Sequence, residues 1–237
     1  YVLNDLADLG NDRRHPSKRH RPLASGAVPL LHGLVLAPAV LAAAIGLALP
    51  LPIEFITSLG AYFALTLAYS LWLKRAMPLD VVMLACLYGA RLYAGGVAVA
   101  VPLSPWLAAF SIFMFLSLAV IKRCTELIGH IEKGKGDPAG RGYTLHDLSV
   151  LEAMAAASGY VAVMVFALYI SSPAVVALYS HPGRLWLICI GLIYWITRML
   201  ILTHRGEMHD DPVVFAAKDR ASLISAAFIA SVVLASV

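Results

Sequence analysis

The sequence predicts an all-α membrane protein, a polytopic bundle of about seven transmembrane helices. Two observations lead to this fold class. Hydrophobic residues make up 60% of the 237 residues and charged residues only 14%, whereas soluble domains contain about 25% charged residues. The apolar residues also form runs near the roughly 20 residues that a helix needs to cross the hydrocarbon core. No segment alternates polar and apolar residues with period two, so a transmembrane β-barrel is not expected.

Seven apolar segments with little charge account for most of the chain. Several contain glycine and proline, which membrane helices tolerate. The segments comprise residues 24–51, 53–73, 79–101, 104–121, 150–171, 185–203 and 221–237. We expect them to form a single transmembrane domain over residues 1–237. Because Tyr1-Val2-Leu3 has the character of the last turn of an apolar helix, we also expect at least one helix upstream of it.

The charges are distributed unequally between the two ends of these segments. If the segments alternate across the membrane, 15 of the 18 Lys and Arg residues fall on one side and only Arg184 falls on the other. Basic residues are enriched in cytoplasmic loops, so we expect a multi-pass protein of the cell membrane with these loops in the cytoplasm. Of the 14 acidic residues, only Glu54 lies on the opposite side. The topology rule does not require this, so the cytoplasmic side has the composition of a site for metal ions and phosphates.

Four polar residues near the start of the chain share one stripe of a helix. At about 100° per residue, Asn4, Asp5, Asp8 and Asp12 fall within about 100° of one another. Like charges three or four residues apart repel each other, so this arrangement favours a bound cation. Carboxylate and amide oxygens suit Mg²⁺, which is usually bound together with substrate phosphates. The alternative is a solvated helix end whose charge is neutralised by neighbouring arginines.

The pattern Asn4-Asp5-x-x-Asp8-x-x-x-Asp12 resembles the first aspartate-rich motif, NDxxDxxxD, of the UbiA prenyltransferase superfamily. The following HPSKRHRPLASG is similar to that family's basic loop. The resemblance implies a bundle of nine transmembrane helices around a central cavity, in which these four residues hold Mg²⁺ on a diphosphate. Since the motif follows the second helix in the family, the resemblance places about seven complete spans in this chain and the first helix and most of the second upstream.

The resemblance also indicates a branch of the superfamily. Where the aromatic prenyltransferases carry a second motif, DxxxD, this chain has Lys122, Arg123 and Glu126. The segments KRCTEL, VPLSPWL and THRGEMHDDPVVFAAKDR resemble the branch of polyprenyl-phosphate phosphoribosyltransferases. The implied reaction is the Mg²⁺-dependent transfer of phosphoribose from phosphoribosyl diphosphate to a polyprenyl phosphate in the membrane. The alternative is transfer of a polyprenyl group from its diphosphate to an aromatic acceptor such as 4-hydroxybenzoate. Nucleic acid is not an expected partner.

A phosphoribosyl transfer requires more positive charge from the protein than a prenyl transfer. Phosphoribosyl diphosphate and a lipid phosphate together carry about −7, taking roughly −2 for each monophosphate, and one Mg²⁺ cannot offset this. The expected catalytic residues are Asp5, Asp8 and Asp12. The expected substrate-binding residues are Asn4, Tyr69, Lys74, Arg91, Lys122, Arg123, Glu126 and Arg198.

Each basic candidate also has a structural interpretation. Arg91 lies within an apolar span, where an unpaired charge costs at least about 2.5 kcal/mol, so it contacts either a phosphate or an internal acid. Lys122 and Arg123 end a span and either bind phosphate or anchor the helix at the interface by snorkelling. The same alternatives apply to Lys74, and Arg198 lies near the end of its span.

Other polar residues carry weaker predictions. A group of aspartates, Asp210, Asp211 and Asp219, either supplies a second metal or ribose contact or caps the last helix. His204 and His209 are five residues apart, a spacing that does not place two ligands on one face of a helix. The three cysteines form no CxxC pair and predict neither zinc nor a disulfide. A transporter is the third functional hypothesis, but the sequence has no internal repeat to support it.

Overall fold

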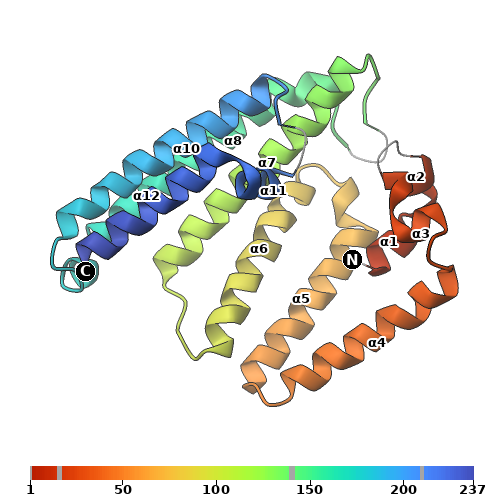
Figure 1. Ribbon diagram of the computed structural model, residues 1–237, viewed down its shortest axis with the longest axis horizontal. Helices are drawn as coiled ribbons and strands as arrows, with labels where there is room; N and C mark the ends of the chain where they lie inside the picture. The colour runs from red at the N-terminus through yellow and green to blue at the C-terminus, as the bar shows by residue number, and fades with distance from the viewer. Residues whose placement is uncertain (1, 15–17, 139–141, 209–210) are drawn as a thin grey trace. The chain divides into compact units, whose positions relative to one another are not determined.

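The computed structural model describes residues 2–14, 18–138, 142–208 and 211–237, and these are helical or in turns and loops, without a strand among them (Figure 1). Within these residues, six helices are long and apolar enough to cross a membrane, and a bent pair of helices brings the number to as many as seven. The prediction of an all-α polytopic membrane protein is therefore confirmed. The chain divides into two compact units, one of residues 1–73 and 94–101 and one of residues 74–93 and 102–237.

The first unit begins with short helices and continues with two long apolar ones. The helices are α1 (Val2–Ala7), α2 (Leu9–Arg14), η1 (Lys18–His20), α3 (Pro22–Ser25), α4 (Leu30–Ala48) and α5 (Ile53–Leu71). Gly26 ends α3 with φ of 80°, a left-handed conformation that glycine adopts without steric cost. A Cβ at Gly33 would lie 3.0 Å from the Leu23 side chain, so α4 begins in close contact with α3. In the predicted span at 24–51, the long helix α4 begins at Leu30, and the first residues of the span belong to the end of α3 and the turn after it.

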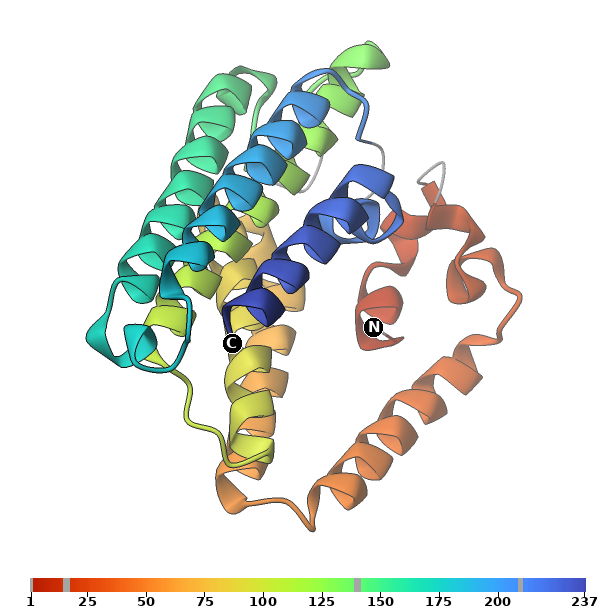
Figure 2. The same ribbon diagram turned by 60° about the vertical axis from the view of Figure 1, so that its left-hand side comes forward.

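The second unit is dominated by long helices that lie side by side. It contains the 3₁₀ turn η2 (Leu73–Arg75), most of α6 (Leu79–Ala98), α7 (Pro105–Glu132), η3 (Leu145–Asp147), α8 (Leu148–Ile170), α9 (Pro173–Val176), η4 (Pro182–Leu185), α10 (Trp186–His204), α11 (Pro212–Lys218) and α12 (Arg220–Ser236). Both views show α7, α8, α10 and α12 packed in one bundle (Figures 1 and 2). Where α8 crosses its neighbours, a Cβ at Gly159 would lie 2.8 Å from Ile196 and 3.1 Å from Ser117. Small residues of this kind allow membrane helices to approach closely.

Helix α7 is longer than the sequence predicted. We expected the span at 104–121 to be followed by a loop, but the helix continues to Glu132. The physical reason is an apolar stripe beyond the span, because Cys124, Leu127 and Ile128 recur at helical spacing and are buried. At 28 residues α7 is longer than the roughly 20 residues that cross a bilayer. Lys122 and Arg123 therefore lie within the helix and not in a loop that follows it.

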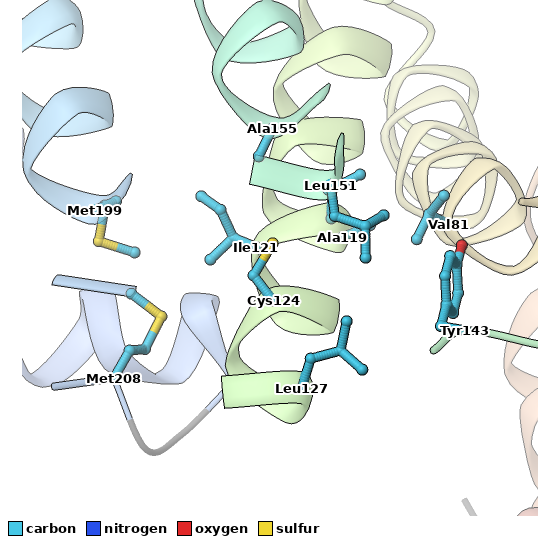
Figure 3. Close-up of a cluster of buried hydrophobic side chains, with 11 residues drawn as sticks. Val81, Ala119, Ile121, Cys124, Leu127, Tyr143, Leu151, Ala155, Met199 and Met208 are labelled. Carbon is cyan, nitrogen blue, oxygen red and sulfur yellow. The ribbon is translucent and has the colours of Figure 1, made fainter. Parts of the chain in front are cut away.

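The core of this bundle is centred on α7. In Figure 3, Ile121, Cys124 and Leu127 of α7 lie between the methionines Met199 and Met208 on one side and Val81 and Tyr143 on the other. Met199 and Val81 have no exposed surface, and the other labelled side chains are buried as well. The cluster therefore joins α6, α7, α8, α10 and the segment that enters η3 into one packed body.

Candidate active site

The aspartate motif lies in the first unit, across the junction of two short helices. Asp8 forms a turn between α1 and α2, so the stripe that we predicted on one helix is interrupted. The helical spacing survives, since Asp8 N donates to Asn4 O at 2.9 Å and Asp12 N donates to Asp8 O at 2.8 Å. Asn4, Asp5 and Asp8 are half-buried, while Asp12 is 3% exposed. The four predicted residues thus keep their helical spacing across the junction, and Asp12 is the buried member.

A guanidinium group bridges two of these carboxylates. Arg21, which precedes α3, places Nη1 2.8 Å from Asp5 Oδ1 and 2.9 Å from Asp12 Oδ2. Arg13 Nε donates to Ala24 O at 3.3 Å, which holds α2 against α3. The sequence drew attention to the basic loop but did not single out Arg21. Its position near the acidic stripe supports the part of the alternative interpretation in which neighbouring arginines offset the carboxylates.

The donor atoms of this cluster are chemically suited to Mg²⁺. Carboxylate and amide oxygens are hard ligands, and the shared contact with Arg21 already shows two carboxylates converging on one cation. Among the described residues, however, no three His, Cys, Asp or Glu side chains converge as a complete metal-binding group. The contact of Arg21 with Asp5 and Asp12 is therefore the observation in this segment that fits a bound cation.

In the second unit, the adjacent basic residues of α7 differ in environment. The Lys122 side chain is 41% exposed, and its Nζ lies 2.5 Å from Asp211 Oδ2. The Arg123 side chain is only 2% exposed. It pairs with Glu126 one turn later and lies 3.4 Å, from Nε to Oδ2, from Asp80 at the start of α6. Only Lys122 of this pair therefore has surface open to a ligand.

Two aspartates of the C-terminal region cap helices and also bind cations from other helices. Asp211 Oδ1 accepts a hydrogen bond from Val213 N at 3.0 Å at the start of α11, and its Oδ2 accepts one from Lys122 Nζ. Asp219 accepts from Ser222 N at 2.8 Å at the start of α12, where the chain bends by 80°. Arg198 of α10 donates to both oxygens of Asp219, at 2.6 and 3.0 Å. Asp219 therefore caps the last helix, as the alternative interpretation expected, whereas Asp211 caps α11. Asp210 and His209 lie outside the described residues.

The remaining predicted site residues are Arg91, Tyr69 and Lys74. Arg91 is exposed on α6 and its guanidinium carbon lies 5.3 Å from the centre of the Tyr88 ring, within the range of a cation–π contact. Tyr88 in turn stacks on Phe115 of α7 with ring centres 4.7 Å apart. Tyr69 is half-buried on α5 of the first unit, and Lys74 is half-buried in η2.

An open pocket of about 250 Å³ lies between α7, α8 and α10. Its wall is largely apolar, with Cys124, Ala155 and Leu200 among the lining residues. At its polar edge, His204 Nδ1 lies 2.8 Å from Glu152 Oε1. None of the residues predicted to bind substrate lines it, so this pocket was not predicted from the sequence.

Comparison with known proteins adds independent information. A model of the UbiA prenyltransferase family matches residues 1–232. The chain is 40% identical over 233 residues to the uncharacterized protein y4nM of Sinorhizobium fredii, an alignment that covers 98% of this chain and 45% of that protein. It is 35% identical over 227 residues to nodulation protein NoeC of Azorhizobium caulinodans, covering 94% of this chain and 73% of NoeC.

A third relative is named for its reaction. Decaprenyl-phosphate phosphoribosyltransferase of Corynebacterium glutamicum is 34% identical over 136 residues, covering 56% of this chain and 41% of that enzyme. The chain thus spans less than half the length of this relative and of y4nM.

Proposed function

Because the chain belongs to the UbiA prenyltransferase family, a family of membrane transferases, we propose that it transfers phosphoribose from phosphoribosyl diphosphate to a polyprenyl phosphate. The bond between the anomeric carbon and the diphosphate breaks, and the diphosphate leaves with the electron pair. A phosphate oxygen of the lipid forms the new bond to the anomeric carbon. No general base is required, since the lipid phosphate is already ionised at neutral pH.

The observation that carries this proposal is the environment of Lys122 on α7. Lys122 combines 41% exposure of its side chain with a carboxylate partner, Asp211, at 2.5 Å. An incoming phosphate can replace Asp211 as that partner, because both are anionic oxygen acceptors. The partial similarity to a protein named decaprenyl-phosphate phosphoribosyltransferase supports transfer of a phosphoribosyl group to a polyprenyl phosphate.

The aspartate motif of the first unit is the proposed metal-binding element. Asn4, Asp5, Asp8 and Asp12 would hold Mg²⁺ on the diphosphate, where the metal supplies charge neutralisation for the leaving group. In the protein itself, Arg21 offsets the charge of Asp5 and Asp12 at 2.8 and 2.9 Å and keeps α1, α2 and α3 together. Lys122, Arg91 and Lys74 would bind and orient the remaining phosphates.

The proposal is tested by supplying membranes that contain the protein with two labelled donors in separate reactions. Label from phosphoribosyl diphosphate should enter the lipid fraction, and the Asp8→Ala variant should not incorporate it. Incorporation only from polyprenyl diphosphate into an aromatic acceptor would instead support the alternative prenyl transfer.

A further inference from the structure

Three polar side chains meet in the interior of the second unit. Asp80 and Arg123 are each 1% exposed, and Tyr143 is 4% exposed. Tyr143 donates its hydroxyl to Asp80 Oδ1 at 2.6 Å, while Arg123 Nε lies 3.4 Å from Asp80 Oδ2. One carboxylate therefore faces a hydroxyl and a guanidinium that come from different parts of the chain.

These side chains connect three segments. Asp80 begins α6, Arg123 belongs to α7, and Tyr143 precedes η3 and α8. The residue before Tyr143 is Gly142, where a Cβ would lie 3.3 Å from Met77 Cβ and 3.5 Å from the carbonyl oxygen of Arg75. The segment that carries Tyr143 is thus packed against the turn that follows Lys74.

The burial of Arg123 limits what it can contact. Its side chain is 2% exposed, whereas that of the adjacent Lys122 is 41% exposed. A buried arginine paired with a buried aspartate stabilises a defined arrangement only while both charges are present, and removing one leaves the other uncompensated. The pair therefore has the properties of a structural connection between α6 and α7.

We propose that Asp80, Arg123 and Tyr143 form a positioning network that holds the Lys74 turn at a fixed distance from the end of α7. Arg123, which the sequence assigned to the substrate, acts through this network and does not touch the phosphates. The network would thereby fix the distance between Lys122, on α7, and Lys74. That Lys74 and Lys122 serve phosphate binding rests on the proposed function; the network itself does not.

The first test is a double-mutant cycle on the full chain in lipid nanodiscs, with thermal unfolding as the readout. Arg123→Met and Asp80→Leu should each lower the unfolding midpoint, because each leaves a buried charge without its partner. The double variant should recover most of the loss, since apolar residues of similar volume can replace a buried ion pair. Strictly additive changes in the midpoint would overturn the network.

The second test asks whether Arg123 contacts substrate. Phosphoribosyl diphosphate should bind the double variant about as tightly as it binds the wild-type chain, whereas Lys122→Gln, the matched control at the next position, should weaken binding about ten- to a hundredfold. A stable double variant that loses binding to the same extent as Lys122→Gln would show that Arg123 holds a phosphate and would overturn the proposal. If the wild-type chain binds no phosphoribosyl diphosphate, the proposed function fails and the stability cycle alone decides the network.

The third test measures positioning directly and needs no substrate. Spin labels at Arg75 and Ile131, in a chain without its native cysteines, report the distance between the turn and the end of α7. Tyr143→Phe removes the hydroxyl contact with Asp80 but keeps the ring in the core, so the distance distribution should broaden. The same variant should lower kcat about tenfold at temperatures well below its unfolding midpoint, because small displacements of positioned groups reduce rates strongly. An unchanged distance distribution and an unchanged kcat would contradict the positioning role.

Discussion

Arg198 donates hydrogen bonds to both carboxylate oxygens of Asp219, at 2.6 and 3.0 Å. The same carboxylate accepts the backbone N–H of Ser222 at the start of α12. The pair therefore joins α10 to the point where the chain turns by 80° between α11 and α12. Arg198 was predicted to bind substrate, and its contact with Asp219 also predicts a structural role that can be measured.

Replacing Asp219 with Ala should destabilise the start of α12. Loss of a helix N-cap costs about 1 kcal/mol, and loss of the partner for Arg198 adds to this, so the unfolding midpoint should fall. The control is Arg205→Ala, because Arg205 is 63% exposed and lies 3.9 Å from Glu207. Exposed pairs of this kind contribute at most about 1 kcal/mol. Equal midpoints for the Asp219 and Arg205 variants would contradict the structural role of the Arg198–Asp219 pair.

Arg21 should respond to the presence of Mg²⁺. In Arg21→Gln, the carboxylates of Asp5 and Asp12 lose their shared cation, so hydrogen exchange in residues 2–14 should become faster without metal. Mg²⁺ should restore protection, because a divalent ion can replace the guanidinium between the two carboxylates. Exchange rates that Mg²⁺ leaves unchanged in this variant would argue against a metal at the motif. Asp137→Ala serves as a control for non-specific loss of an acidic residue.

Removing either Asp5 or Asp8 should abolish transfer while the protein stays folded. Both residues are half-buried at a helix junction and contribute little to the apolar core, so Ala at either position should reduce activity far more than the unfolding midpoint. Chelation of divalent ions should have the same effect on the wild-type chain. Undiminished turnover in both variants would contradict the assignment of these residues to the diphosphate.

Arg91 should contribute through its planar guanidinium. It lies over Tyr88, whose ring stacks on Phe115, and this arrangement favours a fixed orientation of the charged group. Arg91→Ala should weaken phosphoribosyl diphosphate binding by about ten- to a hundredfold, the cost of one charge-assisted contact. Arg91→Lys should restore only part of this, since lysine keeps the charge but loses the two-donor fork. Normal binding in both variants would assign Arg91 a purely structural role.

The predicted orientation can be measured by labelling a cysteine at Lys135. This position is exposed and avoids Gly134, whose φ of 58° disfavours other residues. Cys86 is exposed and must be changed to Ser, whereas Cys124 and Cys189 are buried. An impermeant reagent should label the new cysteine from the cytoplasmic side. Labelling from the opposite side of intact cells would contradict the topology derived from the positive charges.

The sequence was informative where one physical effect dominates. The apolar spans could be predicted because the cost of placing charges in the bilayer is large, and the aspartates could be placed together because helical spacing is regular. The continuation of α7 to Glu132 was missed because its apolar stripe lies among charged residues. The contact of Arg123 with Asp80 could not be predicted because the two residues are distant in the sequence. The available signal was a single acidic residue at the start of the apolar segment LDVVML.

The most direct measurement is the identity of the lipid product made by the purified protein. With phosphoribosyl diphosphate, a polyprenyl phosphate and Mg²⁺, mass spectrometry should detect a lipid that has gained a phosphoribosyl group, with one diphosphate released for each molecule formed. The reaction should be absent in Asp8→Ala. The absence of this lipid with the wild-type protein, together with a prenylated product from polyprenyl diphosphate and 4-hydroxybenzoate, would contradict the proposed phosphoribosyl transfer.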